Sequence, residues 1–143
     1  MEQRTFSGRK IAELRAKRLA SARSTTAYEQ YLEVENYKTL FQAQLAAHYA
    51  CVGGRLRVGG MTAREVWNTT TNASDMRWML QTFAGFDRNG IAPNGAKYFK
   101  TNKFWTASAA EIRLAVRFDL LRKYSGMFRS YKLPLRLLDG ASQ

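Results

Sequence analysis

Hydrophobic residues recur every three or four positions along several stretches of the chain, which is the spacing of an amphipathic helix. The longest stretch follows Thr26 and Glu29, a capping-box pair, and stops at Gly53-Gly54, which can end a helix. We therefore predict one helix over about 27–52 with an apolar stripe that faces a core. The stripe contains Tyr31, Val34, Phe41, Leu45, Tyr49 and Val52.

The same signals predict three further helices, two of which begin at capping-box pairs. These helices span about 62–67, 72–84 and 108–124. In the helix predicted over 72–84, one apolar stripe is formed by Met76, Met79, Leu80 and Phe83. The third is apolar on two sides, with Ile112, Val116 and Leu120 on one and Leu114, Phe118 and Leu121 on the other. The predicted fold class is mostly α, a small single-domain bundle of about four helices.

Four glycines surround Arg55 and Arg57 in the segment 53–60. Glycine adopts backbone conformations that other residues avoid, so the segment predicts either a flexible loop or one short β-hairpin. It is either a plain linker or a loop whose backbone and arginines approach phosphate groups closely. It lacks the Gly-Lys-Ser/Thr run of a phosphate-binding loop.

A long irregular loop is predicted over 86–106, where Asn89-Gly90 and Asn94-Gly95 are tight-turn signals. Lysines and aromatic residues alternate in its second half, namely Lys97, Tyr98, Phe99, Lys100, Lys103, Phe104 and Trp105. Two interpretations are open. The aromatic rings either anchor the loop to the core or stack on unpaired bases while the lysines bind phosphates.

The chain ends are more basic than its middle, which predicts three parts: a basic N-terminal arm over 1–24, a helical core domain over 25–126 and a basic, apolar C-terminal tail over 127–143. The arm is either a solvated terminal helix or a segment that orders on a polyanion. Pro134 interrupts any helix in the tail, which we expect to pack on the core or on a partner.

The net charge restricts the possible classes of function more than any sequence motif does. The 143 residues include 23 Lys and Arg against 11 Asp and Glu, a net charge of +12, which favours a polyanionic or acidic partner. One histidine and one cysteine are too few for an ordinary zinc site. Most acids are explained by caps or by ion pairs within a helix. We therefore expect no enzyme activity, no catalytic residues, no metal, no cofactor and no small-molecule substrate.

No apolar run is long enough to cross a bilayer, and the first thirty residues lack a secretory signal pattern. We therefore expect no membrane partner. The expected location is intracellular, cytoplasmic or nucleoid-associated, with an organelle left open.

The leading hypothesis is a nucleic-acid-binding protein that contacts mainly the backbone with low sequence specificity. RNA or single-stranded DNA is favoured over a duplex because stacking needs exposed bases. The candidate binding residues are Arg9, Lys10, Arg15, Lys17, Arg18, Arg55, Arg57, Lys97, Phe99, Lys100, Lys103 and Trp105.

The alternative is a protein–protein component. It is either a small basic subunit of a large nucleoprotein assembly, or a phage-type adaptor or inhibitor that docks on an acidic protein surface. Aromatic residues and arginine dominate interface hot spots. Its candidate anchors are Trp78, Leu133, Leu135, Arg136, Leu137 and Leu138.

Overall fold

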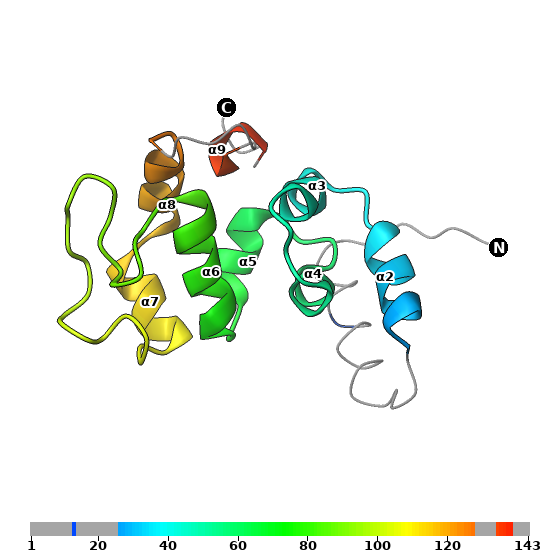
Figure 1. Ribbon diagram of the computed structural model, residues 1–143, viewed down its shortest axis with the longest axis horizontal. Helices are drawn as coiled ribbons and strands as arrows, with labels where there is room; N and C mark the ends of the chain where they lie inside the picture. Colours follow the sequence, from blue (N-terminus) through cyan, green and yellow to red (C-terminus); the bar gives the residue numbers. More distant parts are fainter. Residues whose placement is uncertain (1–12, 14–25, 128–133, 139–143) are drawn as a thin grey trace. The chain divides into compact units, whose positions relative to one another are not determined.

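The computed structural model describes residue 13 and residues 26–127 and 134–138 (Figure 1). The helices in these ranges are α2 (Ala27–Glu35), α3 (Leu40–Ala47), α4 (Val52–Val58), α5 (Ala63–Thr69), α6 (Ala73–Phe83), α7 (Ala109–Ala115), α8 (Phe118–Ser125) and α9 (Leu135–Leu138). No strand occurs in the described ranges, where β-pairing is limited to an isolated bridge between Ile91 and Lys97. The mostly α character is confirmed. The chain forms two compact units, divided in sequence between Thr62 and Ala63.

The first unit contains α2, α3 and α4, and its predicted long helix over 27–52 is wrong. The capping box at Thr26 and Glu29 is present, but α2 ends at Glu35. A new helix, α3, then begins after Thr39, whose hydroxyl accepts a hydrogen bond from the Gln42 N–H at 3.1 Å. Threonine bonds nearby backbone groups and so favours a cap over a helix interior. The spacing of the apolar residues does not show this preference of Thr39, so it predicted one continuous helix.

Tyr49 ends α3 in a left-handed conformation with φ 60°. The Ala50 N–H donates to the Leu45 carbonyl and the Tyr49 N–H donates to the Ala46 carbonyl, which together make a Schellman motif. Glycine usually occupies this position. Tyr49 is 82% exposed, and Tyr31 is also exposed, so neither belongs to the buried stripe that the sequence predicted.

The glycine-rich segment folds as helix α4, so the predicted loop or hairpin is wrong. Cys51 caps it, because its Sγ accepts a hydrogen bond from the Gly54 N–H at 3.3 Å. Leu56 and Val58 are buried. Burying two aliphatic side chains stabilises by about 1.5–3 kcal/mol each, which exceeds the roughly 0.5–1 kcal/mol that each helical glycine costs. Gly59 ends the helix with φ 56°.

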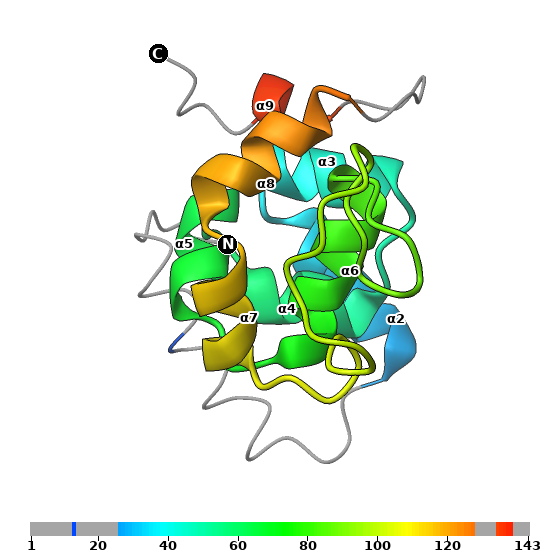
Figure 2. The same cartoon turned by 90° about the vertical axis from the view of Figure 1, so that its left-hand side faces the viewer.

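The second unit contains α5 to α9, with α6 in contact with both α7 and α8 (Figures 1 and 2). Helices α5 and α6 begin and end close to the predicted bounds. The predicted stripe of α6 is confirmed, since all four of its residues are buried. The core also contains Trp67, Ile112, Phe118, Leu121 and Tyr124.

The predicted helix over 108–124 is two helices, because the backbone is extended at Val116. The indole N–H of Trp67 donates to the Val116 carbonyl at 3.1 Å and satisfies a group that a continuous helix would bond internally. Arg113 holds the same region, because its guanidinium donates to the carbonyls of Trp67 and Thr70. The break leaves Leu114 84% exposed, contrary to its predicted place on a packed side.

Part of the tail packs on the second unit, as expected. Leu135 is fully buried, and the backbone N–H of Arg136 donates to the Ser125 hydroxyl at 3.2 Å. A Cβ at Gly126 would lie 2.8 Å from Nε of Arg136, so this glycine permits the close approach.

Candidate functional site

The loop between α6 and α7 is irregular, as predicted, and is shaped by two tight turns. In the first, the Gly90 N–H donates to the Asp87 carbonyl at 2.9 Å, and the Ile91 N–H donates to the Asp87 carboxylate at 3.0 Å. In the second, the Gly95 N–H donates to the Ala92 carbonyl at 2.8 Å. Both predicted turns are confirmed.

Gly90 brings the first turn against the side chain of Phe104. Its φ is +79°, and a Cβ at this position would lie 2.6 Å from Cδ1 of Phe104. Other side chains rarely adopt this backbone conformation, and here none has room. Glycine at residue 90 therefore permits the close approach of this turn to Phe104.

Phe104 is the buried anchor of the loop, with 1% of its surface exposed. The rings of Phe99 and Trp105 each lie 5.2 Å from it in edge-to-face contact. From α6, the Arg77 guanidinium donates to the carbonyls of Phe104 and Ala107 at 3.3 and 3.1 Å. The anchoring interpretation of the aromatic residues therefore holds for Phe104.

A second contact fixes the middle of the loop to α8. Phe86, Tyr98 and Tyr124 form a cluster of mutually contacting rings. The hydroxyls of Tyr98 and Tyr124 are hydrogen-bonded to each other, and this bond raises the pKa of Tyr98 above its ordinary value. Tyr98 therefore carries no negative charge at neutral pH that would repel an anion.

Trp105 remains largely exposed despite these anchors, with 55% of its surface accessible. Its indole N–H donates to the Arg88 carbonyl at 2.6 Å. The Arg77 guanidinium carbon lies 5.6 Å from the ring centroid, within the range of a cation–π contact. The ring is thus held by its edge and by one face, and it keeps enough exposed surface to contact another planar group.

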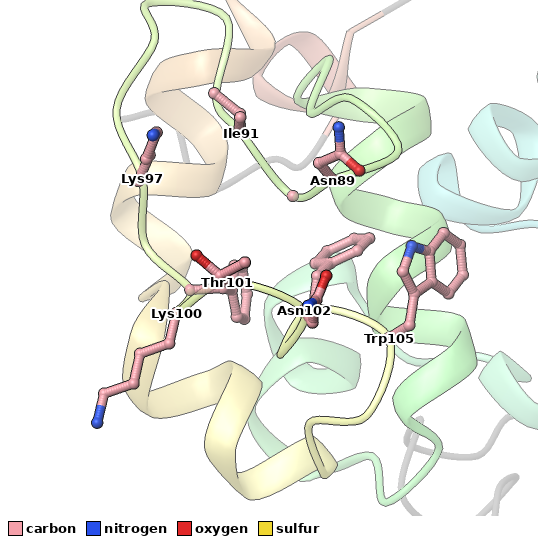
Figure 3. Close-up of a pocket in the computed structure, with 10 residues that line it drawn as sticks. Asn89, Ile91, Lys97, Lys100, Thr101, Asn102 and Trp105 are labelled. Carbon is pink, nitrogen blue, oxygen red and sulfur yellow. The ribbon is translucent and has the colours of Figure 1, made fainter.

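A cavity of about 270 Å³ lies between the first turn and the segment 97–105 (Figure 3). Its lining comes entirely from this loop: Asn89, Gly90, Ile91, Lys97, Phe99, Lys100, Thr101, Asn102, Phe104 and Trp105. Figure 3 shows the side chain of Lys100 extending away from the cavity, and Lys97 is exposed as well. The loop thus combines apolar walls with exposed positive charge at the rim.

The other predicted binding residues are not part of this cavity. Arg9, Lys10, Arg15, Lys17 and Arg18 lie outside the described residues. Lys103 is exposed in the same loop but does not line the cavity, and Arg57 is exposed on α4.

Arg55 is buried, in contrast to its predicted role at a phosphate-facing loop. Its Nε donates to the Gln42 side-chain oxygen at 3.0 Å, and its guanidinium lies 3.5 Å from the Glu35 carboxylate. The Gln42 amide nitrogen in turn donates to the carbonyls of Arg55 and Gly59, both at 2.9 Å. Sequence reasoning missed this polar network, because glutamine and arginine in a helical pattern are usually solvent-facing.

Some of the residues predicted to contact a protein partner pack against other residues of the chain itself. Trp78 is half-buried and packs edge-on against Phe83 at 5.4 Å, and Leu135 is fully buried. Arg136 and Leu137 are exposed on α9. Leu133 lies outside the described residues, and Leu138 is the last residue of α9.

Within the described ranges, no three His, Cys, Asp or Glu side chains come together as a metal site requires. None of the described helices combines the length and apolar character needed to cross a membrane. No family model matches the chain, and no curated protein and no solved structure is significantly similar to it. Functional inference therefore depends on the geometry of the loop itself.

Proposed function

We propose that this protein binds single-stranded nucleic acid, RNA or DNA, through the loop 86–106. The observation that carries the proposal is the exposed ring of Trp105 beside a cavity whose rim bears Lys97 and Lys100. Stacking of a base on an aromatic ring contributes about 1–3 kcal/mol, and lysine contacts to phosphate release counterions.

The rigid support of the Trp105 ring favours a binding role over a merely structural one. The Arg77 guanidinium bonds the Phe104 carbonyl, and the backbone carbonyl of Arg88 accepts the hydrogen bond from the Trp105 indole. A ring that is already held in place loses little conformational entropy when a ligand stacks on it. A single strand is favoured over a duplex because only unpaired bases present a free face.

The test is binding of the full chain to labelled oligomers of about 12 nucleotides, as single-stranded RNA, single-stranded DNA and duplex DNA. Anisotropy is measured from about 50 to 300 mM salt. We expect tighter binding to a single strand than to the duplex. Lys97→Ala and Lys100→Ala each reduce the salt slope by about 0.7, the value for one lost phosphate contact on a single strand.

Lys38→Ala is the matched control, because Lys38 is an exposed lysine in the first unit and its loss changes the net charge equally. If all three variants change the slope to the same extent, the loop is not the binding site. If all oligomers bind equally weakly and dissociate by about 150 mM salt, the interaction is general polyanion attraction. An acidic protein partner would then be the better hypothesis.

A further inference from the structure

The cavity in the loop has the size of a site for a small planar group. Its volume of about 270 Å³ falls just below the roughly 300–1,000 Å³ of most small-molecule sites. Phe99, Phe104 and Trp105 supply the apolar part of its lining. Such a cavity accommodates one aromatic ring system rather than an extended ligand.

Three exposed polar side chains, those of Asn89, Thr101 and Asn102, line the cavity. An amide offers donors and an acceptor together, and a hydroxyl offers both. The edge of an unpaired nucleobase presents the complementary mixture of donors and acceptors.

Asn102 also has an unusual backbone, with φ 65° in the left-handed region. Asparagine tolerates this conformation better than most residues, but it remains less stable than the ordinary helical one. Residues held in such conformations cluster at ligand-binding sites, where the surrounding structure fixes them. Figure 3 shows Asn102 beside Thr101 at the lower edge of the cavity, across from Asn89.

We infer that the cavity holds one unpaired nucleobase, stacked on Trp105, with its edge contacted by Asn89, Thr101 and Asn102. This inference rests on the proposed function and extends it. Lys97 and Lys100 at the rim are placed for the phosphates on either side of that nucleotide. Binding therefore depends on base identity at one position, in contrast to the low sequence specificity that the sequence predicted.

The experiment compares single-stranded homopolymers of adenine, cytosine and uracil with an abasic oligomer of equal length, all of about 12 nucleotides. We expect the preferred homopolymer to bind the full chain at least about tenfold more tightly than the abasic strand. Asn102→Gly keeps the left-handed backbone and removes the amide. It reduces the preference among the three bases by about threefold or more and leaves the salt slope unchanged.

Asn89→Ala is a second test, because it removes an exposed amide without altering a strained backbone. Asn94→Gly is the control within the same loop, since Asn94 does not line the cavity. Unfolding midpoints of all variants establish that they are folded. If Asn102→Gly and Asn89→Ala both retain the full base preference, the assignment of these amides is overturned.

Other outcomes separate this inference from the proposed function. Equal binding of abasic and normal strands, with a salt slope that still depends on Lys97 and Lys100, overturns the base cavity and leaves nucleic-acid binding intact. Binding of free nucleoside monophosphates with the same base preference, without binding to strands, supports the cavity and overturns the proposed function. No binding to either kind of ligand overturns both.

Discussion

The segments 52–60 and 86–106 both combine glycines with basic side chains, yet they fold in different ways. The first is a helix in which Arg55 is buried against Gln42 and Glu35. The second is irregular, and Lys97, Lys100 and Lys103 are exposed. Glycine and positive charge together therefore do not define a ligand-binding loop. The two segments differ in the backbone conformation of their glycines and in the space around them.

In the helical segment, Gly53 and Gly54 have ordinary helical surroundings. A Cβ at either position would meet its nearest neighbour at 3.5 Å, which is normal contact. In the loop, Gly90 and Gly95 have φ values of +79° and +87°, which few other residues adopt. Glycine is thus a replaceable residue in the helix and a required one in the loop, and substitutions measure that difference directly.

The largest effect is expected for Gly90→Ala. The new Cβ would overlap the Phe104 ring, and the residue would keep a positive φ. Overpacking costs about 1–3 kcal/mol and left-handed backbone about 1–2 kcal/mol, so the variant should lose about 3 kcal/mol of unfolding free energy. Urea denaturation measures this loss.

Gly95→Ala is the matched control, because its φ is similar and a Cβ there meets nothing within 4 Å. It should lose only the backbone contribution of about 1–2 kcal/mol. Equal losses for the two variants would contradict the close contact between Gly90 and Phe104.

Arg55→Ala is expected to have the next largest effect. It removes the bonds to Gln42 and Glu35 and leaves the buried Gln42 oxygen without its donor. An unsatisfied buried group costs about 1–3 kcal/mol, so we expect a loss of about 2 kcal/mol in the same measurement. Arg57→Ala, at an exposed position on the same helix, should change stability by less than about 0.5 kcal/mol. If Arg55→Ala instead leaves stability unchanged and weakens oligonucleotide binding, the contrast between the two segments is wrong.

The sequence predicted the second unit better than the first. Helix α6 was predictable because Asn72 caps it and its apolar residues keep a strict helical spacing. The turns at Gly90 and Gly95 were predictable because an Asn-Gly pair favours a tight turn. These signals are local, so no knowledge of distant contacts was needed.

Two of the failures, the break at Val116 and the burial of Arg55, depend on contacts between residues far apart in sequence. The break at Val116 is stabilised by the indole of Trp67, 49 positions away. The burial of Arg55 depends on Gln42 and Glu35, which belong to other helices. Part of the candidate site, the lysines and aromatic residues, was visible in the sequence. The roles of Arg77, Asn89 and Asn102 were not, because only folding brings them to Trp105 and the cavity.

Replacement of Gly53 or Gly54 by alanine should have a smaller effect of the opposite sign. Both lie in the first turn of α4 with room for a Cβ. Alanine restricts the unfolded chain and favours the helix, so each variant should gain about 0.5 kcal/mol of unfolding free energy. A loss of stability in both would indicate that the segment needs glycine after all, as Gly90 does in the loop.

The smallest effect concerns Lys103, whose charge helps to lower the pKa of Glu111. The pKa of Glu111 is lowered by hydrogen bonds from the backbone and hydroxyl of Ser108 and also by the charge of Lys103. Because the folded pKa lies below the unfolded one, this carboxylate stabilises the folded state at neutral pH. The contribution is lost as pH falls through the folded pKa. Lys103→Ala should therefore raise the pKa of Glu111 slightly, as measured by NMR titration of its carboxyl carbon.

Glu29 is the internal control for that titration, because the same kind of capping box lowers its pKa and no lysine contributes. Its pKa should not change in Lys103→Ala. Because the charge of Lys103 acts on the Glu111 carboxylate, we expect Lys103 to contribute less to phosphate binding than Lys100. Lys103→Ala should consequently reduce the salt slope of oligonucleotide binding by less than the roughly 0.7 expected for Lys100→Ala. Equal reductions would show that proximity to the loop's aromatic residues, rather than freedom from acidic neighbours, determines which lysines bind the strand.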